Sequence, residues 1–268
     1  MNQPNLESDH LDYLVVRSFD ELSPFLDSFL ALYRRIFLRE YAPKLLGHLY
    51  RDCPCGQGSG VLVLRGDEVL GFAGIIPQEI EAAGKVVSYG LSINMMVAPE
   101  IRSGGATFVR MVKELESLAR RSGYEFILGF PNQNAFLPFV KLAGWRLVDE
   151  ARFAEGDIAV AGYIDFLRAQ TQKAFLTKRL LRWRLTRFSY RVVSGCLLKE
   201  YLGETNLIDL LESQPLQPFQ GIFPYWSSFG KSQFRLREDY VARLTWQPLQ
   251  NSFCIDDLKL SLLYSDVF

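Results

Sequence analysis

The sequence predicts an α/β (α+β) fold built on a central mixed β-sheet, with a smaller α+β part after it. Residues 86–97 have the pattern of a strand, and residues 106–121 have the pattern of a helix, with a short glycine-containing loop between the two segments. A second strand pattern follows at 125–130, so the three segments predict a right-handed βαβ unit with two parallel strands. Residues 61–64 and 69–76 flank an Arg-Gly-Asp turn and predict an antiparallel hairpin. Parallel and antiparallel pairs together indicate a mixed sheet.

Two helices are expected before this hairpin. Residues 18–24 have the composition of a helix start, and apolar residues then recur at helical spacing as far as Phe37. The sequence Tyr-Ala-Pro at 41–43 ends that pattern, and a second helix is expected over about 43–51. Between the hairpin and the long strand, residues 78–84 are expected to form a turn.

The composition changes near residue 150, and we predict two domains, 1–150 and 151–268. In the second part, residues 164–195 are expected to form one or two helices, with a break near Thr177 or Thr186. The last part is expected to hold a short helix at 237–244 and strand-like runs at 219–223, 232–236 and 252–264.

Composition and charge limit the classes of function. Of the 268 residues 49% are hydrophobic, which is enough for a sizeable core. The 30 basic and 30 acidic residues balance, so overall charge gives no argument for nucleic acid as a partner. No apolar stretch reaches 18 residues, so we expect no transmembrane segment. The polar amino end lacks the apolar core of a signal peptide, and a cytoplasmic protein is expected.

Cysteine and histidine are few and do not form a recognisable site. Cys53 and Cys55 are too close in sequence for a disulfide of ordinary geometry, and no set of four Cys or His residues has zinc-like spacing. We therefore expect no metal. Neither His10 nor His48 lies in the sequence context of a Ser or Cys nucleophile, which argues against a hydrolase.

The loop between the long strand and the next helix has the character of an anion site. The backbone N–H groups of Arg102 to Gly105 can point at one spot, where the dipole of the helix that begins at Ala106 is positive. The loop is not a Walker loop and is not a dinucleotide fingerprint, because it lacks G-K-[ST] and G-x-G-x-x-G. It predicts a phosphate or pyrophosphate site of another kind.

Two motifs resemble those of the GCN5-related N-acetyltransferases. Arg102, Gly105 and Thr107 occupy the key positions of the family's cofactor motif R/Q-x-x-G-x-G/A, with Thr107 in place of the usual Gly or Ala. Residues 132–145, N-Q-N-A-F-L-P-F-V-K-L-A-G-W, resemble the closing segment N-x-x-A-x-x-L-Y-x-K-x-G-F, with one residue inserted before the glycine. The resemblance covers about residues 18–148 and implies that family's fold, in which the two parallel strands splay apart.

The resemblance also implies a binding site for acetyl-coenzyme A, with no metal. The cofactor would lie between the splayed strands, with its pantetheine paired to the backbone at Met96 and Val97 and its pyrophosphate on the amides of 102–107. The N–H of Met96 would polarise the thioester carbonyl, and one such amide can lower the barrier by roughly a few kcal/mol. The predicted cofactor-binding residues are Met96, Val97, Arg102, Ser103, Gly104, Gly105, Ala106, Thr107, Asn132 and Phe139.

Proton transfer has no clear side chain in this alignment. The family's basic Glu aligns with Leu91 and its acidic Tyr aligns with Phe139, and neither residue can transfer a proton. We therefore expect catalysis mainly by positioning and oxyanion stabilisation, with Tyr41, Tyr89 or His48 as residues that could reach the site from elsewhere. The predicted acceptor-binding residues are Tyr41, Tyr89, Ser92 and Asn94.

Three further features bear on the acceptor. The resemblance places the loop at 38–43 on the wall of the acceptor pocket, which makes Leu38 to Tyr41 candidate contacts. Residues 173–191 hold seven basic residues and no acid, and three interpretations stay open: a helix face packed on the core, a basic wall for a phosphorylated acceptor, or an amphipathic membrane-surface helix. Residues 238–248, E-D-Y-V-A-R-L-T-W-Q-P, loosely resemble an element in the tails of two-domain bacterial acetyltransferases, many of which act on amino sugars.

Two functional classes follow. The first is an enzyme that moves an acetyl group from acetyl-coenzyme A to a primary amine, and the second is a binding protein of the same fold without chemistry. Within the first class, the tail resemblance, the 13% aromatic residues and the basic run favour a nucleotide-linked (dTDP) amino-deoxy sugar for surface polysaccharide. A small antibiotic or peptide amine is the alternative. The oligomeric state, a homodimer included, is left open by the sequence.

Overall fold

The computed structural model describes residues 10–157, 163–186, 190–193, 196–201, 204–210, 220–230, 235–250 and 253–262. In chain order its main elements are β1 (Asp12–Val16), α1 (Phe19–Leu22), α2 (Leu26–Phe37), α3 (Pro43–Tyr50), β2 (Ser59–Arg65), β3 (Glu68–Ala82), β4 (Lys85–Val97), α4 (Ala106–Arg121), β5 (Phe126–Gly129), α5 (Gln133–Leu137), β6 (Arg146–Asp157), α6 (Tyr163–Gln170), β7 (Phe175–Leu176), α7 (Lys178–Leu185), β8 (Tyr190–Val193), β9 (Cys196–Tyr201), β10 (Glu204–Leu210), β11 (Gln220–Trp226) and β12 (Arg235–Pro248).

The described strands form one mixed sheet. Eleven of them follow the order β1-β2-β3-β4-β5-β12-β6-β11-β10-β9-β8, and β7 pairs with β3 outside this path. β4 and β5 run parallel, as do β10 and β11, and the other neighbours are antiparallel. The predicted α/β fold with a mixed sheet and a βαβ unit is confirmed.

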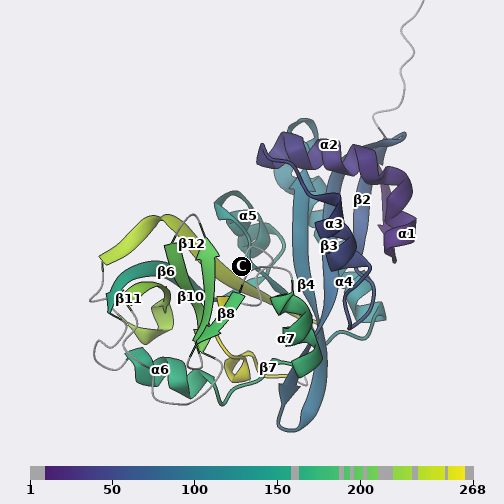
Figure 1. Ribbon diagram of the computed structural model, residues 1–268. Coiled ribbons are helices and arrows are strands. Elements are labelled where there is room, and N and C mark those ends of the chain that lie inside the picture. The colour runs from purple at the N-terminus through teal and green to yellow at the C-terminus, as the bar shows by residue number, and fades with distance from the viewer. Residues whose placement is uncertain are drawn as a thin grey trace, which may run out of the picture.

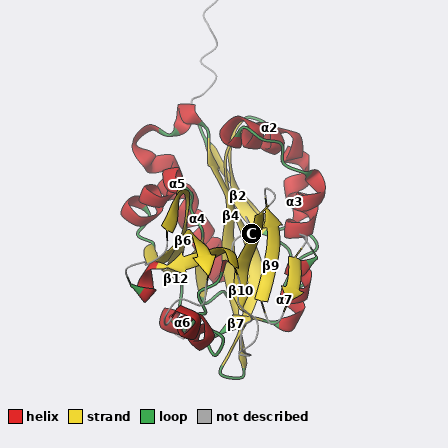
Figure 2. Cartoon of the chain, turned by 60° about the vertical axis from the view of Figure 1, so that its left-hand side comes forward, coloured by secondary structure: helices red, strands yellow, loops and turns green. Residues whose placement is uncertain are grey.

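Helices cover both faces of the amino-terminal part of the sheet. Figure 2 shows α2 and α3 on one face of β2 and β4, with α4 and α5 on the other. On the first face, Phe29 of α2 packs edge-on against Phe72 of β3, with 5.0 Å between ring centroids. On the second face, α4 buries one apolar stripe, because Met111, Val112 and Leu115 recur at helical spacing. The two layers hold β4 rigidly in the middle of the core.

The parallel strands β4 and β5 part after a short paired stretch. They pair at Gly90–Ser92 and Ile127–Gly129, and β5 then ends while β4 continues to Val97. Within β4 the register with β3 moves from the pair Gly74–Ile93 to the pair Phe72–Met96, which marks a β-bulge. The bulge contains Asn94 at φ 53°, a left-handed conformation that Asn adopts more readily than most residues. The end of β4 therefore has an open edge.

The last long strand returns to the first part of the sheet. β12 lies between β5 and β6 and pairs with both. Its residues Thr245–Pro248 pair with β5, and residues within its range 235–246 pair with β6. Figure 1 shows the carboxyl-terminal strands beside the amino-terminal half of the molecule, with α7 next to α3 and β7 close to β3. Residue 150 lies within β6, so the two predicted domains share one sheet. The division into domains stays a prediction.

Several expected elements differ from the structure. The helix expected at 237–244 is wrong, because these residues belong to β12, where the buried residues Ala242, Leu244 and Trp246 alternate at the period of a strand. The turn expected at 78–84 is shorter than predicted. Residues 78–82 belong to β3, which continues to Ala82, and only Ala83 and Gly84 form the tight turn that follows.

The remaining expectations for the carboxyl-terminal part are partly confirmed. The helical region breaks at Thr177, between β7 and α7, and its end forms β8 in place of a helix. Of the run expected at 219–223, residues 220–223 belong to β11; residues 219 and 232–234 lie outside the described residues, and 235–236 belong to β12. Residues 253–262 contain a short 3-10 turn, Ile255–Asp257, and are not a strand.

Candidate functional site

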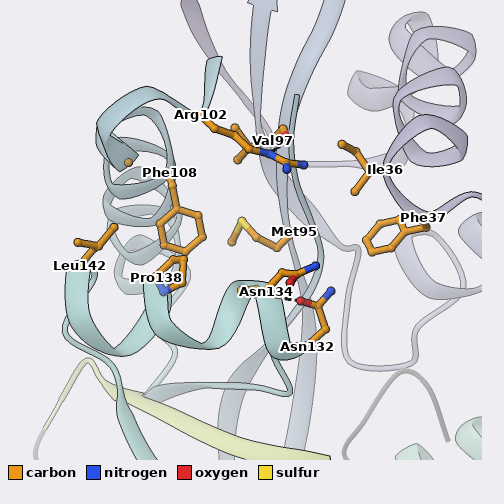
Figure 3. A pocket seen from close by; sticks show the side chains of 12 residues that line it. Ile36, Phe37, Met95, Val97, Arg102, Phe108, Asn132, Asn134, Pro138 and Leu142 are labelled. Atoms are coloured by element: carbon orange, nitrogen blue, oxygen red, sulfur yellow. Dashed lines mark hydrogen bonds between the residues drawn. The ribbon is translucent and has the colours of Figure 1, made fainter. Parts of the chain in front are cut away.

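A pocket of about 450 Å³ lies where β4 and β5 have parted (Figure 3). Its walls come from the end of α2, the end of β4, the loop before α4, the first turn of α4, and the segment that follows β5. The residues that line it are Ile36, Phe37, Met95, Val97, Arg102, Gly105, Phe108, Asn132, Asn134, Ala135, Pro138 and Leu142. Three stretches that are distant in sequence, 36–37, 95–108 and 132–142, thus meet at the open edge of β4.

The register of β4 decides which backbone amides face this pocket. Ala98 N–H donates to Leu70 O at 2.7 Å, and Met96 occupies the next position of the same kind opposite Phe72. Because hydrogen bonding alternates along an antiparallel strand, the amide of Met96 faces β3 and those of Met95 and Val97 face the open edge. In this register the N–H of Met96, which the sequence predicts as the oxyanion donor, faces β3 and not the open edge, and its role stays a prediction. The sequence motif located the strand end but not its bulge.

The loop before α4 has the geometry of an anion site. Gly104 and Gly105 have φ of 64° and 74°, left-handed values that favour glycine. A Cβ on Gly105 would lie 2.7 Å from Leu142 Cδ1, so a side chain there would intrude on the pocket wall. No side chain caps α4, whose N-cap residue is Gly105, so the amides of its first turn point outward without a side-chain acceptor.

Arg102 is the charged residue among the twelve that line the pocket. Its Nε donates a hydrogen bond to the carbonyl oxygen of Val97 at 2.8 Å, which shows that this carbonyl faces the pocket and not β3. Of the other predicted loop residues, Gly105 and Asn132 also line the pocket. Ser103, Gly104, Ala106 and Thr107 lie in the same turn, beside the lining residues.

The segment after β5 forms the opposite wall. Asn132 is the N-cap of α5, where its Oδ1 accepts a hydrogen bond from Ala135 N at 2.9 Å. The side chains of Asn132 and Asn134 both lie at the pocket in Figure 3. A π-helix, Pro138–Leu142, follows, with Ala143 N bonded to Pro138 O at 3.0 Å. A π-helix accommodates one extra residue, which accounts for the insertion before Gly144 in the sequence motif.

Phe139 is not among the residues that line the pocket, and its role as a cofactor-binding residue stays a prediction. Its ring is 3% exposed and packs against Phe108 and Trp145, at centroid distances of 5.2 and 4.5 Å. Phe108 and Leu142 take its place at the pocket wall. The π-helix changes which side chains of this segment face inward, and the insertion before Gly144 is the sequence signal of that change.

Two of the predicted acceptor-binding residues meet at the bulge of β4. Asn94 Nδ2 donates hydrogen bonds to Tyr41 Oη at 3.3 Å and to Tyr50 Oη at 3.4 Å. Tyr50 was not predicted. Ser92 is buried at the last paired position of β4 and β5, where the two strands begin to part. Leu38 is 88% exposed at the end of α2, beyond the lining residue Phe37.

Tyr89 and His48 lie away from the pocket lining. Tyr89 is fully buried and stacks on Phe126 at 5.0 Å, and burial raises the pKa of its hydroxyl above the ordinary value. Tyr89 is not among the residues that line the pocket, and its contact with the acceptor stays a prediction. The ring of His48 stacks on Trp183 of α7, with centroids 4.6 Å apart. This contact joins α3 to the carboxyl-terminal part of the chain.

Three residues of the basic run contact polar groups of the protein itself. Arg179 forms an ion pair with Glu79, and Arg191 forms one with Glu200. Arg184 is buried and donates two hydrogen bonds to Gln78 Oε1, at 2.7 and 3.2 Å. These contacts fit the first of the three interpretations, a helix packed on the core.

Among the described residues, no three His, Cys, Asp or Glu side chains gather in a way that suits a metal ion. Within the same part of the chain, no helix has the length and apolar character needed to cross a membrane.

Comparison of the sequence with protein-family models and with curated proteins gives no match. Its fold, however, is similar to solved structures. A GCN5-related N-acetyltransferase from Kribbella flavida matches with a TM-score of 0.56 at 14% identity, over 90% of this chain and 72% of that one. One from Anabaena variabilis matches with a TM-score of 0.54 at 10% identity, over 89% and 73%.

A third structure is similar in length. It is a protein of Pyrococcus horikoshii assigned as an acetyltransferase, with a TM-score of 0.52 at 13% identity, and the match covers 96% of each chain. The chain therefore has the fold of the GCN5-related N-acetyltransferases, with the central mixed sheet and splayed parallel strands of that fold. The resemblance stated from the sequence motifs is confirmed at the level of the fold.

Proposed function

We propose that the protein transfers an acetyl group from acetyl-coenzyme A to a primary amine. One observation carries this proposal: the pocket joins the open edge of β4 to the first turn of α4, and both present backbone amides. A thioester cofactor with a diphosphate needs both features, an anion site for the diphosphate and an extended edge for the amide-containing arm. Acetyl transferases of this fold supply the precedent.

The residues present fit such a cofactor. The glycines at 104 and 105 leave the N-terminus of α4 open, and Arg102 adds a positive charge beside it. The backbone of Val97 would pair with the pantetheine arm, and Asn132 and Asn134 offer amide groups on the other wall. When bound, the cofactor would supply an acetyl group already activated as a thioester.

The chain's contribution to the chemistry is mainly geometric. In the transfer, the amine nitrogen forms a bond to the carbonyl carbon, the carbon–sulfur bond breaks, and the sulfur leaves as a thiolate that takes up a proton. We propose the N–H of Met95, which faces the open edge, as the donor to the carbonyl oxygen. Asp, Glu, His, Lys, Cys and Tyr are missing from the twelve lining residues, so water would carry the amine proton.

For the acceptor, the first candidate to test is a nucleotide-linked amino sugar such as a dTDP-amino-deoxyhexose. Two of the sequence features that favoured this acceptor are weakened by the structure. Arg179 and Arg184 of the basic run contact Glu79 and Gln78 of the protein itself. Residues 237–244, which overlap the tail element of the two-domain acetyltransferases, form a strand and not the expected helix. A small antibiotic or peptide amine is the second candidate, favoured by the apolar side chains of Ile36 and Phe37 on the wall that α2 contributes.

The experiment has two parts. Calorimetry with coenzyme A tests the cofactor site, and release of free thiol from acetyl-coenzyme A in the presence of dTDP-amino sugars, aminoglycosides and peptide amines tests the transfer. Binding together with amine-dependent thiol release is the expected result. Binding without thiol release for any amine favours a non-catalytic binding protein of this fold. Absence of coenzyme A binding overturns the proposal.

A further inference from the structure

Three polar side chains meet at the bulge of β4, inside an otherwise aromatic layer. The amide of Asn94 lies between the hydroxyls of Tyr41 and Tyr50 and donates to both, at 3.3 and 3.4 Å. Tyr41 is 8% exposed and Tyr50 is 1% exposed. The two hydrogens of one Asn amide thus have two acceptors, one just before α3 and one at its last residue.

Packing fixes both tyrosines. The ring of Tyr41 meets Tyr33 edge-on at 4.5 Å, and the ring of Tyr50 packs on Phe72 at 6.0 Å. Gly74 of β3 leaves the space for the second hydroxyl, because a Cβ there would lie 1.9 Å from Tyr50 Oη. The hydroxyls are therefore fixed points against which the side chain of Asn94 is held.

The backbone of Asn94 is the part of β4 that departs from regular geometry. Its φ of 53° is left-handed, and this bulge moves the register by one residue between Ile93 and Met96. Without the bulge, alternation from Ile93 would turn the amide of Met95 toward β3. With it, the amide of Met95 faces the open edge, where the side chains of Met95 and Val97 line the pocket.

We propose that Tyr41 and Tyr50 clamp Asn94 and thereby aim the amide of Met95 at the thioester carbonyl. Asn94, Tyr41 and Tyr50 are positioning residues in this inference, and none of the three transfers a proton or contacts the reacting atoms. The inference rests on the proposed function and adds to it the device that holds the oxyanion donor in place. It replaces the acceptor contact predicted for Tyr41 and Asn94 from the sequence.

The test uses a signal from the carbonyl itself, so it does not depend on knowing the acceptor. Acetyl-coenzyme A labelled with ¹³C at the carbonyl is bound to the full-length protein, and its ¹³C chemical shift is compared with that of the free compound. A hydrogen bond from an oriented amide polarises the carbonyl and moves its resonance downfield. We expect this downfield shift in the unaltered protein.

The variants separate backbone conformation from the clamp. Asn94→Ala removes the amide group and disfavours the left-handed backbone, whereas Asn94→Gly removes the amide group but permits that backbone. The double variant Tyr41→Phe/Tyr50→Phe keeps Asn94 and removes both acceptors. We expect the downfield shift to fall by more than half in Asn94→Ala and in the double variant, and by less in Asn94→Gly. Calorimetric affinity for coenzyme A should stay within about twofold, since the anion site is untouched.

Tyr33→Phe is the matched control. It removes a hydroxyl from the same aromatic cluster, but this hydroxyl accepts from Arg39 and not from Asn94. The ¹³C shift should be unchanged in this variant.

Where an acceptor is known, kcat should fall at least about tenfold in Asn94→Ala, because the loss of one oxyanion donor costs about 10²–10³-fold. Combining Asn94→Ala with the two Tyr→Phe changes should lower kcat no further.

Each other outcome is decisive. If the unaltered protein binds coenzyme A and the ¹³C shift is the same in all variants, the inference is wrong and the proposed function stands. If Asn94→Ala raises the acceptor KM and leaves the ¹³C shift unchanged, these residues contact the acceptor instead. If the unaltered protein does not bind coenzyme A, the proposed function fails and the inference fails with it.

Discussion

The indole N–H of Trp145 donates a hydrogen bond of 3.1 Å to Oε1 of Glu116, and both residues are 1% exposed. Lys113 donates to the same carboxylate, at 2.9 and 3.1 Å, and to the carbonyl oxygen of Ala143 at 3.2 Å. These contacts join α4 to the end of the π-helix. They hold two walls of the pocket at a fixed separation, because Phe108 lies on the first element and Leu142 on the second.

Removing this carboxylate should destabilise the protein. Glu116→Ala leaves the indole N–H buried without its acceptor and Lys113 without its ion-pair partner, so we expect a loss of about 3 kcal/mol in the free energy of unfolding. Glu116→Gln keeps an acceptor oxygen and should lose about 1 kcal/mol. Urea unfolding followed by tryptophan fluorescence measures both. Glu114→Ala on the same helix is the control and should change stability by less than about 0.5 kcal/mol.

Gly105 should be required for cofactor binding as well as for the loop conformation. Gly105→Val puts a branched side chain at φ 74° and within 2.7 Å of Leu142 Cδ1, on the pocket wall. Gly123→Val is the matched control, because its φ is 77° and a Cβ there meets nothing within 4 Å. Both variants should lose about 1–2 kcal/mol of stability from the left-handed backbone. Calorimetry should show a loss of coenzyme A affinity of tenfold or more in Gly105→Val alone, and equal affinities in the two variants would refute the anion site.

The charge of Arg102 should appear in the salt dependence of binding. A guanidinium beside a diphosphate gains affinity that ionic strength screens, so affinity for coenzyme A should fall as salt rises. In Arg102→Ala this dependence should become shallower and the affinity at low salt should fall about tenfold. Arg102→Lys should recover part of the salt dependence but not the hydrogen bond to Val97 O. A salt dependence that is identical in all three proteins would contradict this assignment.

The local elements of the amino-terminal half could be predicted, because their periodic patterns and loop residues act over short distances. The predicted helix start at Ser18 is one example, where its Oγ accepts from Glu21 N in the structure. The loop at 102–105 is another, since Gly104 and Gly105 are needed for left-handed backbone wherever the rest of the chain lies.

The parts that could not be predicted depend on partners distant in sequence. Residues 237–244 have a helix-like spacing, yet pairing with β6 makes them a strand, because β12 fills the gap between β5 and β6. At the bulge, Asn94 bonds Tyr41 and Tyr50 from another layer, and the strand pattern alone gave no indication of the bulge. The amide of Met96, which the sequence predicts as the oxyanion donor, consequently faces β3 in the structure. The π-helix likewise moved Phe139 out of the pocket.

Buried tyrosines should make the protein lose stability in alkali. Burial raises the pKa of Tyr124 to about 12, above the value of about 10 for an unfolded chain. The native state therefore holds this proton more tightly, and its contribution to stability is complete below about pH 10 and is lost as pH rises toward 12. Between these values, wild type should lose about 2 kcal/mol more than Tyr124→Phe. Urea unfolding at pH 9, 10, 11 and 12 measures the difference, and parallel curves for the two proteins would contradict it.

His48 should support the fold without acting as a base. Its ring stacks on Trp183 at 4.6 Å and 15°, and it is not among the residues that line the pocket. His48→Ala and Trp183→Ala should therefore lower the free energy of unfolding by similar amounts, about 1 kcal/mol or more, because each removes the same contact between α3 and α7. Turnover with an identified amine should fall by less than about tenfold in either variant, since general base catalysis contributes about 10²–10⁴-fold where it operates.

With water as the proton carrier, kcat/KM should rise with pH along the titration of the acceptor amine, and the midpoint should move when an amine of different pKa is used. A midpoint that stays fixed across amines and disappears in His48→Ala, together with a thousandfold loss of kcat at unchanged KM, would establish His48 as the general base.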